Sequence, residues 1–161
     1  RQRYAFQTQI FFLLSRYHQQ HNRVPELLSA SSLISDYTFS KDALFAGINL
    51  QGDELTMYYR VHEALAEKIT PPDLLVYLHA PISKLQQNIR LRNRSYEQNI
   101  PDSYLQNLQD TYSHYLKNQS VPTLLVDVSQ ADFIDNPAHF QQMLEALEKD
   151  YEPGQHFLTL S

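Results

Sequence analysis

Residues 72–101 read PDLLVYLHAPISKLQQNIRLRNRSYEQNIP, and this stretch decides the fold class. Within it, residues 73–80 (DLLVYLHA) form a continuous apolar run, which is typical of a strand buried on both faces. Pro81 then begins an amphipathic helix through Leu85 and Ile89, because proline is favoured in the first turn of a helix. A buried strand followed at once by a helix predicts one unit of a parallel α/β sheet.

The segments on either side extend this pattern. Residues 123–128 (TLLVDV) predict a second buried strand, and residues 32–39 (SLISDYTF) predict a short one. Helical spacing predicts helices over residues 6–17 and 51–69, another from Pro101, and a last one from the Asn136 cap to about Lys149. We therefore expect an α/β fold with helices on both faces of a parallel sheet, one domain over residues 1–151, and a frayed C-terminal tail over residues 152–161.

The composition excludes several classes of protein. With 161 residues and 42% hydrophobic content, the chain can bury one sizeable core. Its net charge of −5 and its interspersed charges argue against a nucleic-acid polymer as partner. The chain has no cysteine, which fits a reducing cytosol, and no apolar run reaches the roughly 18 residues of a membrane span. A soluble, cytoplasmic protein is expected.

The sequence contains no phosphate-binding loop of the GxxxxGK type. Its three glycines are Gly47, Gly52 and Gly154, and none of them stands in such a motif. The first residue is Arg1, which opens directly into a helical pattern. We therefore expect the chain to lack an N-terminal part.

Arg90, Arg92 and Arg94 alternate directly after the helix that follows the strand of residues 73–80. Three guanidinium groups this close repel one another unless an anion lies between them, and arginine binds phosphate oxygens in a bidentate way. The alternative is a solvated helix end, where cations meet the negative end of the helix dipole and Glu97 neutralises the cluster. The spacing alone leaves both interpretations open.

A second group of candidates surrounds the predicted strand of residues 32–39. Gln9 and Arg16 lie two helical turns apart on one side of an apolar helix, where an amide and a guanidinium can read the edge of a base. Asp36 lies in the polar C-terminal half of this predicted strand and Asp42 follows it, near the sheet edge where α/β proteins bind ligands. Alternatively, Arg16 reaches to water, Gln9 fills a packing gap, and Asp42 pairs with Lys41 or Arg16.

Four blocks, in order, resemble the deoxynucleoside kinase family. They are residues 3–16 (RYAFQTQIFFLLSR), 35–46 (SDYTFSKDALFA), 72–81 (PDLLVYLHAP) and 89–108 (IRLRNRSYEQNIPDSYLQNL). The last block is similar to the family's arginine-rich lid and is the most specific of the four. Residues 127–140, which contain FIDNPAHF, resemble a proteobacterial subgroup.

The resemblance implies a three-layer P-loop kinase fold whose first strand and P-loop lie outside this chain. It also implies an enzyme that transfers the γ-phosphoryl group of ATP, with magnesium, to the 5′-hydroxyl of a deoxynucleoside, with a purine favoured. The P-loop and the catalytic base lie upstream in relatives, so the chain alone is expected to be inactive. The apolar width of the first helix, residues 6–17, further predicts that it packs against the sheet and a second subunit in a homodimer.

The family's residue roles transfer to matching positions. By resemblance, Gln9, Arg16 and Asp42 read the base, and Glu97 approaches the sugar hydroxyls. The resemblance assigns the catalytic roles to three residues: the lid arginines Arg92 and Arg94, which bind phosphates, and Asp36, which replaces a glutamate and holds magnesium through water.

Four positions depart from the family's pattern. Tyr37 replaces an arginine of the glutamate motif, and Asn88 replaces a lid arginine. Both changes keep open a catalytically weakened or non-catalytic kinase-fold interaction module. Asn93 and Asn99 stand where glycine is usual, which predicts a positive φ at both. A nucleoside-monophosphate kinase is a further alternative, against which the base-reading set argues.

Overall fold

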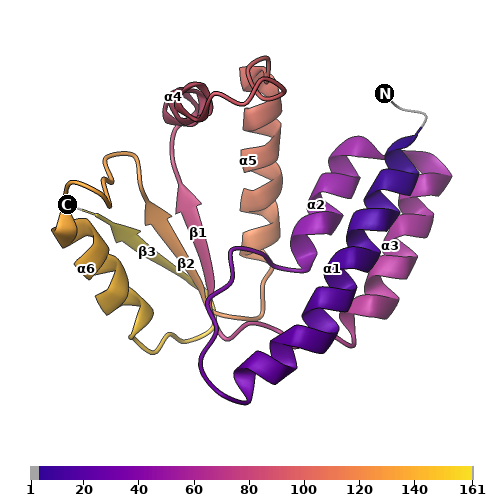
Figure 1. Ribbon diagram of the computed structural model, residues 1–161, viewed down its shortest axis with the longest axis horizontal. Helices are drawn as coiled ribbons and strands as arrows, with labels where there is room; N and C mark the ends of the chain where they lie inside the picture. Colours follow the sequence, from indigo (N-terminus) through magenta and orange to yellow (C-terminus); the bar gives the residue numbers. More distant parts are fainter. Residues whose placement is uncertain (1–3, 161) are drawn as a thin grey trace. The chain divides into compact units, whose positions relative to one another are not determined.

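The computed structural model describes residues 4–160, so Arg1 and Arg3, at the expected start and in the first resembling block, lie outside the described residues. The chain divides into two compact units, one up to residue 72 and one from residue 73 onward. The first unit is helical and the second is built on a sheet (Figure 1).

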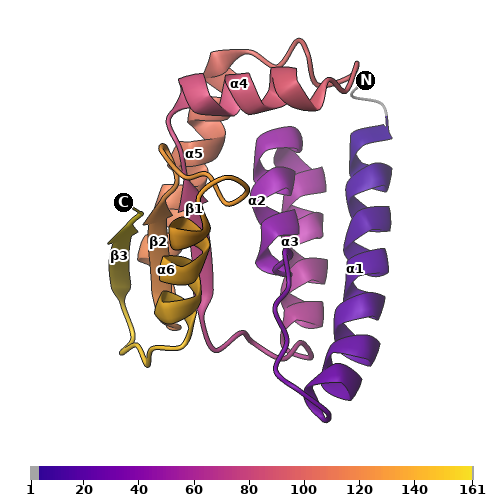
Figure 2. The ribbon, with the colours of Figure 1, turned by 60° about the vertical axis from the view of Figure 1, so that its left-hand side comes forward.

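The first unit consists of α1 (Ala5–Leu28), α2 (Ser40–Asn49) and α3 (Gly52–Ala66). The three helices lie side by side in both ribbon views (Figures 1 and 2). They share one apolar core, formed by the buried residues Leu13, Phe39, Ala46, Leu50 and Tyr58. The helices predicted over residues 6–17 and 51–69 are therefore confirmed, and the first of them runs further, to Leu28.

The strand predicted over residues 32–39 is wrong. This segment is an irregular connection between α1 and α2, and Ile34 is 84% exposed. A strand needs a neighbour that pairs with its backbone. Within the described residues of this unit there is no strand to provide one, so the apolar run forms no strand.

The second unit contains β1 (Leu75–His79), β2 (Thr123–Asp127) and β3 (Gln155–Thr159). The strands are parallel in the order β1-β2-β3, and Leu125 of β2 is in register with Tyr77 and Phe157. The two strands predicted in this unit are confirmed. The expectation of a frayed tail is wrong, because residues 155–159 form β3 and pair with β2 along its whole length.

The helices of this unit are α4 (Ile82–Arg92), α5 (Asp102–Lys117) and α6 (Pro137–Leu147). Ala146 of α6 packs with Leu124 and Val126 on one face of the sheet. Tyr112 of α5 packs against Tyr77 on the other face, with ring centroids 5.5 Å apart. The expected α/β arrangement, a parallel sheet with helices on both faces, is confirmed in this unit (Figure 2).

Local signals explain where these helices begin. The side chain of Asn136 accepts a hydrogen bond from the backbone N–H of Ala138 at 3.1 Å, as expected of an N-cap. Pro81 and Pro101 directly precede α4 and α5. Over residues 4–160, no helix combines the length and the apolar character that a membrane span requires.

Candidate functional site

The arginine segment, residues 90–97, begins in the last turn of α4. Asn93 follows the helix with φ of 51°, in the left-handed region that ends helices. The positive φ predicted there is confirmed. It is wrong for Asn99, because Asn93 is the one residue other than glycine with positive φ among residues 4–160.

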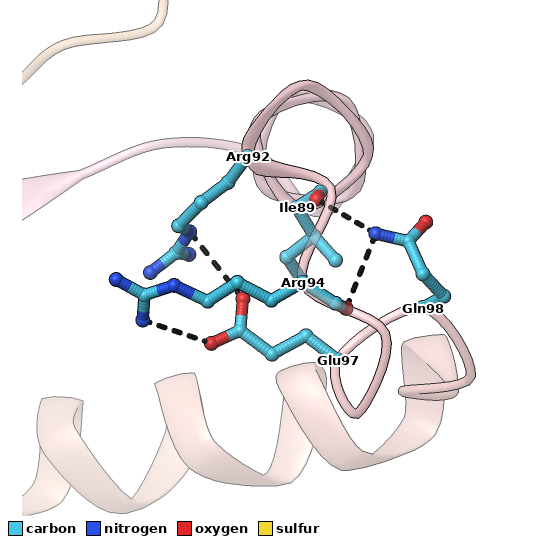
Figure 3. A network of polar contacts seen from close by, with 5 residues as sticks. All are labelled: Ile89, Arg92, Arg94, Glu97 and Gln98. Carbon is cyan, nitrogen blue, oxygen red and sulfur yellow. Dashed lines mark hydrogen bonds and ion pairs between the residues drawn. The ribbon is translucent and has the colours of Figure 1, made fainter.

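Glu97 joins the two arginines that the resemblance placed in the lid (Figure 3). Arg94 Nη1 donates a hydrogen bond to Glu97 Oε1 at 3.3 Å. Arg92 Nε lies 3.3 Å from Glu97 Oε2 without the geometry of a hydrogen bond, and Oε2 is buried with no hydrogen-bond partner among the described residues. One carboxylate thus faces two positive charges, and the pairing with Arg92 is a loose one.

Two glutamines hold this segment in shape. Gln98 Nε2 donates to the carbonyl oxygens of Ile89 at 3.2 Å and Arg94 at 3.4 Å (Figure 3). Gln86 Nε2 donates to the carbonyl oxygen of Ile100 and to Asp102 Oδ1, both at 2.8 Å. Gln98 therefore holds the backbone of the segment and Gln86 holds the chain just after it, while the side chains of Arg92 and Arg94 stay about half exposed.

These contacts suit the binding of a polyanion. Glu97 carries one negative charge, whereas the arginines Arg92 and Arg94 carry two positive charges. The arginine side chains are about half exposed, but that of Glu97 is only 15% exposed, so its carboxylate needs another donor when it leaves them. A phosphate group that accepts several charge-assisted hydrogen bonds can displace Glu97 when such a donor is at hand. Arg90 is exposed and has no ion pair among the described residues.

In the first unit, Tyr37 and Asp42 form a short contact. The Tyr37 hydroxyl donates a hydrogen bond to Asp42 Oδ2 at 2.5 Å, and both side chains are partly buried. Burial raises the pKa of the Tyr37 hydroxyl above its ordinary value, and the bond to Asp42 raises it further. Tyr37 therefore stays protonated and acts as the donor.

Arg16 of α1 joins the same cluster. Its guanidinium carbon lies 4.6 Å from the centre of the Tyr37 ring, which is a cation–π contact, and its Nη1 donates to Gln19 Oε1 at 3.2 Å. Asp42, in the first turn of α2, thus shares one tyrosine with Arg16. The predicted salt bridges of Asp42 with Lys41 or Arg16 are absent from the described part of the chain.

The remaining predicted residues are less engaged. Gln9 lies two turns before Arg16 on α1 and is half-buried. Asp36 is exposed and makes no hydrogen bond or ion pair with another described residue. Between residues 4 and 160, no group of three or more potential metal-binding side chains comes together.

Three stacked aromatic side chains near Asp42, those of Phe39, Tyr58 and His62, were not among the residues predicted from the sequence. The His62 ring stacks on Phe39 at 4.8 Å and on Tyr58 at 6.3 Å. Burial lowers the pKa of His62, and its bond to the Phe39 carbonyl opposes this. The hydroxyl of Tyr58 is buried with no hydrogen-bond partner among the described residues, and burial followed by the charge of Asp42 raises its pKa. Spacing of Tyr58 and His62 at i and i+4 on α3 was the available signal.

The chain is similar in sequence to several known proteins. The chain is 28% identical over 146 residues to a deoxyguanosine kinase of Bacillus subtilis, covering 87% of this chain and 70% of the relative. It is 30% identical over 149 residues to a deoxyadenosine kinase of Dictyostelium discoideum, covering 89% of this chain and 59% of the relative. A more distant relative, 23% identical over 115 residues, is a mitochondrial NADH dehydrogenase 1 alpha subcomplex subunit 10 of Rattus norvegicus, covering 67% of this chain and 32% of that protein.

The chain thus spans between about three-fifths and seven-tenths of the two kinases it matches. The sequence pattern of one family, described as deoxynucleoside kinase, matches residues 1–151 and so extends over both compact units up to the turn before β3. A match of this extent, over nearly the whole sequence, settles the family: the chain is a member of the deoxynucleoside kinases, which have the P-loop kinase fold.

Proposed function

We propose that the complete protein transfers the γ-phosphoryl group of ATP to the 5′-hydroxyl of a deoxynucleoside. The observation that carries this proposal is the pairing of Arg92 and Arg94 with the single carboxylate of Glu97, in a chain of this family. Phosphoryl transfer depends on positioning and on neutralising charge over the transferred group. The two arginines supply that charge once phosphate displaces Glu97.

Glu97 then becomes available for a second role. Its side chain is only 15% exposed, and Oε2 accepts no hydrogen bond from another described residue. A carboxylate released from the arginines accepts hydrogen bonds from the hydroxyls of a sugar. We therefore propose that Glu97 exchanges arginine for sugar when both substrates are bound.

The first unit supplies the proposed recognition of the base. Arg16 presents N–H donors and Asp42 presents a carboxylate, and Tyr37 holds both. Gln9, on the same side of α1 as Arg16, adds an amide with one donor and one acceptor group. A neutral nucleoside needs such polar contacts, because it offers no charge to bind.

Magnesium, the usual companion of ATP in phosphoryl transfer, has one candidate residue among those described. The carboxylate of Asp36 is exposed and unpaired, so its oxygens are free to bind a magnesium ion through water. Proteins often hold Mg²⁺ with one or two carboxylates together with substrate phosphates. When bound, the ion neutralises charge on the phosphates, and Asp36 serves to position it.

The direct test is a transfer assay on the complete protein with γ-labelled ATP. Deoxyadenosine, deoxyguanosine, deoxycytidine and thymidine serve as acceptors, and the product is identified as the 5′-monophosphate. Labelled product that disappears in an Arg92→Ala, Arg94→Ala double variant of unchanged melting temperature supports the proposal. Absence of labelled product with every nucleoside contradicts it.

The same assay separates the two alternatives. A deoxynucleoside monophosphate as acceptor tests for a nucleoside-monophosphate kinase. Binding of nucleosides without turnover indicates a non-catalytic module, which Tyr37 and Asn88 at positions of family arginines favour. Calorimetry then distinguishes a module that binds nucleosides without phosphorylating them from a protein that neither binds nor phosphorylates them.

We also propose a homodimer formed through α1, in the cytoplasm, where the ATP for this reaction is available. Phe11, Phe12 and Leu14 are 69%, 49% and 49% exposed, so one flank of α1 presents a row of apolar side chains. Patches of this kind mark protein interfaces. Only Leu13 of α1 is fully buried in the core of the unit.

Sedimentation of the complete protein at micromolar concentration tests the dimer. A Phe11→Asp variant should sediment as a monomer, because a buried charge in the interface is costly. Ile134→Asp is the matched control, since Ile134 is 89% exposed and lies on a loop of the other unit. A wild-type protein that sediments as a monomer contradicts the proposal.

A further inference from the structure

Tyr37 stands where the family has an arginine, and its side chain contacts both Arg16 and Asp42. Its hydroxyl donates to Asp42 Oδ2 at 2.5 Å, and its ring lies 4.6 Å from the guanidinium carbon of Arg16. The two residues proposed to read the base therefore depend on one tyrosine. The substitution thus removes a positive charge and introduces a tyrosine that positions the donor Arg16 and the acceptor Asp42.

The hydrogen bond restricts how Asp42 can meet a ligand. A carboxylate with both oxygens free can accept two parallel bonds, for example from the adjacent N1–H and N2–H2 donors of guanine. In this protein Oδ2 already accepts from Tyr37, and Oδ1 has no hydrogen-bond partner among the described residues. A second donor at Oδ2 would have to share that oxygen with the Tyr37 hydroxyl, so Oδ1 is the less restricted acceptor. Asp42 therefore suits a single donor better than a pair of parallel donors.

The ring of Tyr37 restricts Arg16 in a complementary way. A guanidinium held on an aromatic face keeps its plane and its N–H donors, and it also keeps its full charge because the ring does not neutralise it. The site therefore combines one acceptor, Oδ1 of Asp42, with the N–H donors of Arg16. The pair matches a base edge that has one exocyclic amino group next to a ring nitrogen acceptor.

We infer that Tyr37 is a specificity-determining residue, which makes the site select bases that carry an exocyclic amino group beside a ring nitrogen acceptor. Adenine and cytosine have this edge, whereas guanine and hypoxanthine present a carbonyl oxygen at the corresponding position. That oxygen would face the carboxylate of Asp42, and two acceptors repel. The inference rests on the proposed base-reading function of Arg16 and Asp42 and narrows its substrate class.

The first experiment needs no variant. The complete protein is assayed with deoxyadenosine and with deoxyinosine, which differ at the amino group. We expect kcat/KM for deoxyinosine to be at least about tenfold lower, because its carbonyl leaves the acceptor of Asp42 unsatisfied. Equal kcat/KM values for the two nucleosides would overturn the inference.

The second experiment uses Tyr37→Phe, which keeps the ring under Arg16 and removes the hydroxyl. With both oxygens of Asp42 free, the ratio of kcat/KM for deoxyguanosine over deoxyadenosine should rise about tenfold or more, with KM for ATP unchanged. Tyr58→Phe is the matched control: it removes a hydroxyl close to Asp42 that makes no hydrogen bond among the described residues, so the ratio should stay constant.

The readouts separate this inference from the function it rests on. Calorimetric binding of both nucleosides to each variant, and its melting temperature, are measured beside the rates. If no nucleoside is phosphorylated or bound by the wild-type protein, the proposed function fails and the inference falls with it. If nucleosides are phosphorylated but folded Tyr37→Phe keeps the wild-type ratio, the inference alone is wrong.

Discussion

The two units hold their arginines in different ways. In the first unit the guanidinium of Arg16 lies on the uncharged ring of Tyr37, so its positive charge is not compensated there. In the second unit Arg92 and Arg94 share the carboxylate of Glu97, which offsets part of their charge. A ring positions a cation without competing for its donors, whereas a carboxylate occupies the place that a ligand anion would take.

This difference fits two kinds of ligand. A neutral base must be recognised by donors and acceptors that are already oriented, because it cannot draw a cation toward itself by charge. A phosphate chain carries enough charge to displace one carboxylate, provided that another donor then binds that carboxylate. The first unit is thus suited to reading, and the arginine segment of the second is suited to exchange.

The largest expected effect comes from removing an exchangeable charge. Arg92→Ala should raise the barrier of phosphoryl transfer by about 2 kcal/mol or more, which is roughly a 30-fold loss in rate, because the developing charge loses a donor. Steady-state rates and thermal melting are measured together on the complete protein.

Arg90→Ala is the matched control for this change. Arg90 is an exposed arginine of the same helix end and has no ion pair among the described residues. Unchanged rates in Arg92→Ala, with both variants folded, would mean that the arginine segment is only a solvated helix end.

The strands show how much of the fold the sequence determines. Residues 73–80 and 123–128 are continuous apolar runs, and each contains a strand of the sheet. Residues 32–39 contain a shorter apolar stretch and have no strand to pair with in the described part of their unit. Residues 155–159 pair with β2 although His156 and Thr159 interrupt their apolar character; the preceding Pro153–Gly154 turn was the available signal. Strand formation depends on a partner, which periodicity does not reveal.

The candidate site divides in the same way. The arginine segment is local, since Arg92, Arg94 and Glu97 lie within six residues. Its sequence made an anion site one of two open interpretations, and the family resemblance favoured it. The cluster around Tyr37 was understood as a lost charge, because its contact with Arg16 depends on how α1 packs beside the chain that leads into α2. Contacts between distant segments need the tertiary structure.

Asp42→Ala should have the next largest effect, and it should change the order of preference among nucleosides more than the overall rate of phosphorylation. Asp42 presents the acceptor of the cluster, so its loss should change the order among deoxyadenosine, deoxyguanosine and deoxycytidine by about tenfold in at least one ratio. KM for ATP should stay nearly constant. Competition assays with mixed nucleosides measure the order; an equal fall for all three would make Asp42 a structural partner of Tyr37.

Glu97→Gln should have a smaller effect, and it should change KM for ATP and KM for the nucleoside in opposite directions. Without the negative charge of Glu97, KM for ATP should fall about two- to fivefold, because no carboxylate then competes with phosphate for the half-exposed Arg92 and Arg94. KM for the nucleoside should rise, because the carboxylate proposed to bind the sugar is gone. Glu63→Gln, on α3, controls for the loss of one negative charge elsewhere. If KM for ATP increases instead, the exchange of Glu97 between arginine and sugar is wrong.

The smallest expected effect concerns the neutral contacts of the first unit and their dependence on pH. Burial lowers the pKa of His62, so the folded state favours the uncharged ring between Phe39 and Tyr58, whereas the unfolded chain takes up a proton near the ordinary pKa of about 6.5. The free energy of unfolding should therefore fall as the pH decreases below about 6.5 and be independent of His62 above it.

His62→Phe keeps an aromatic ring there and does not titrate, so its stability should fall less over the same pH range. His18→Gln, at an exposed position of α1, should follow the wild type. Urea denaturation between about pH 5.5 and 7.5 measures both slopes. Parallel curves for the wild type and His62→Phe would show that His62 is charged as readily in the folded protein as in the unfolded chain, which would contradict the proposed neutral stack.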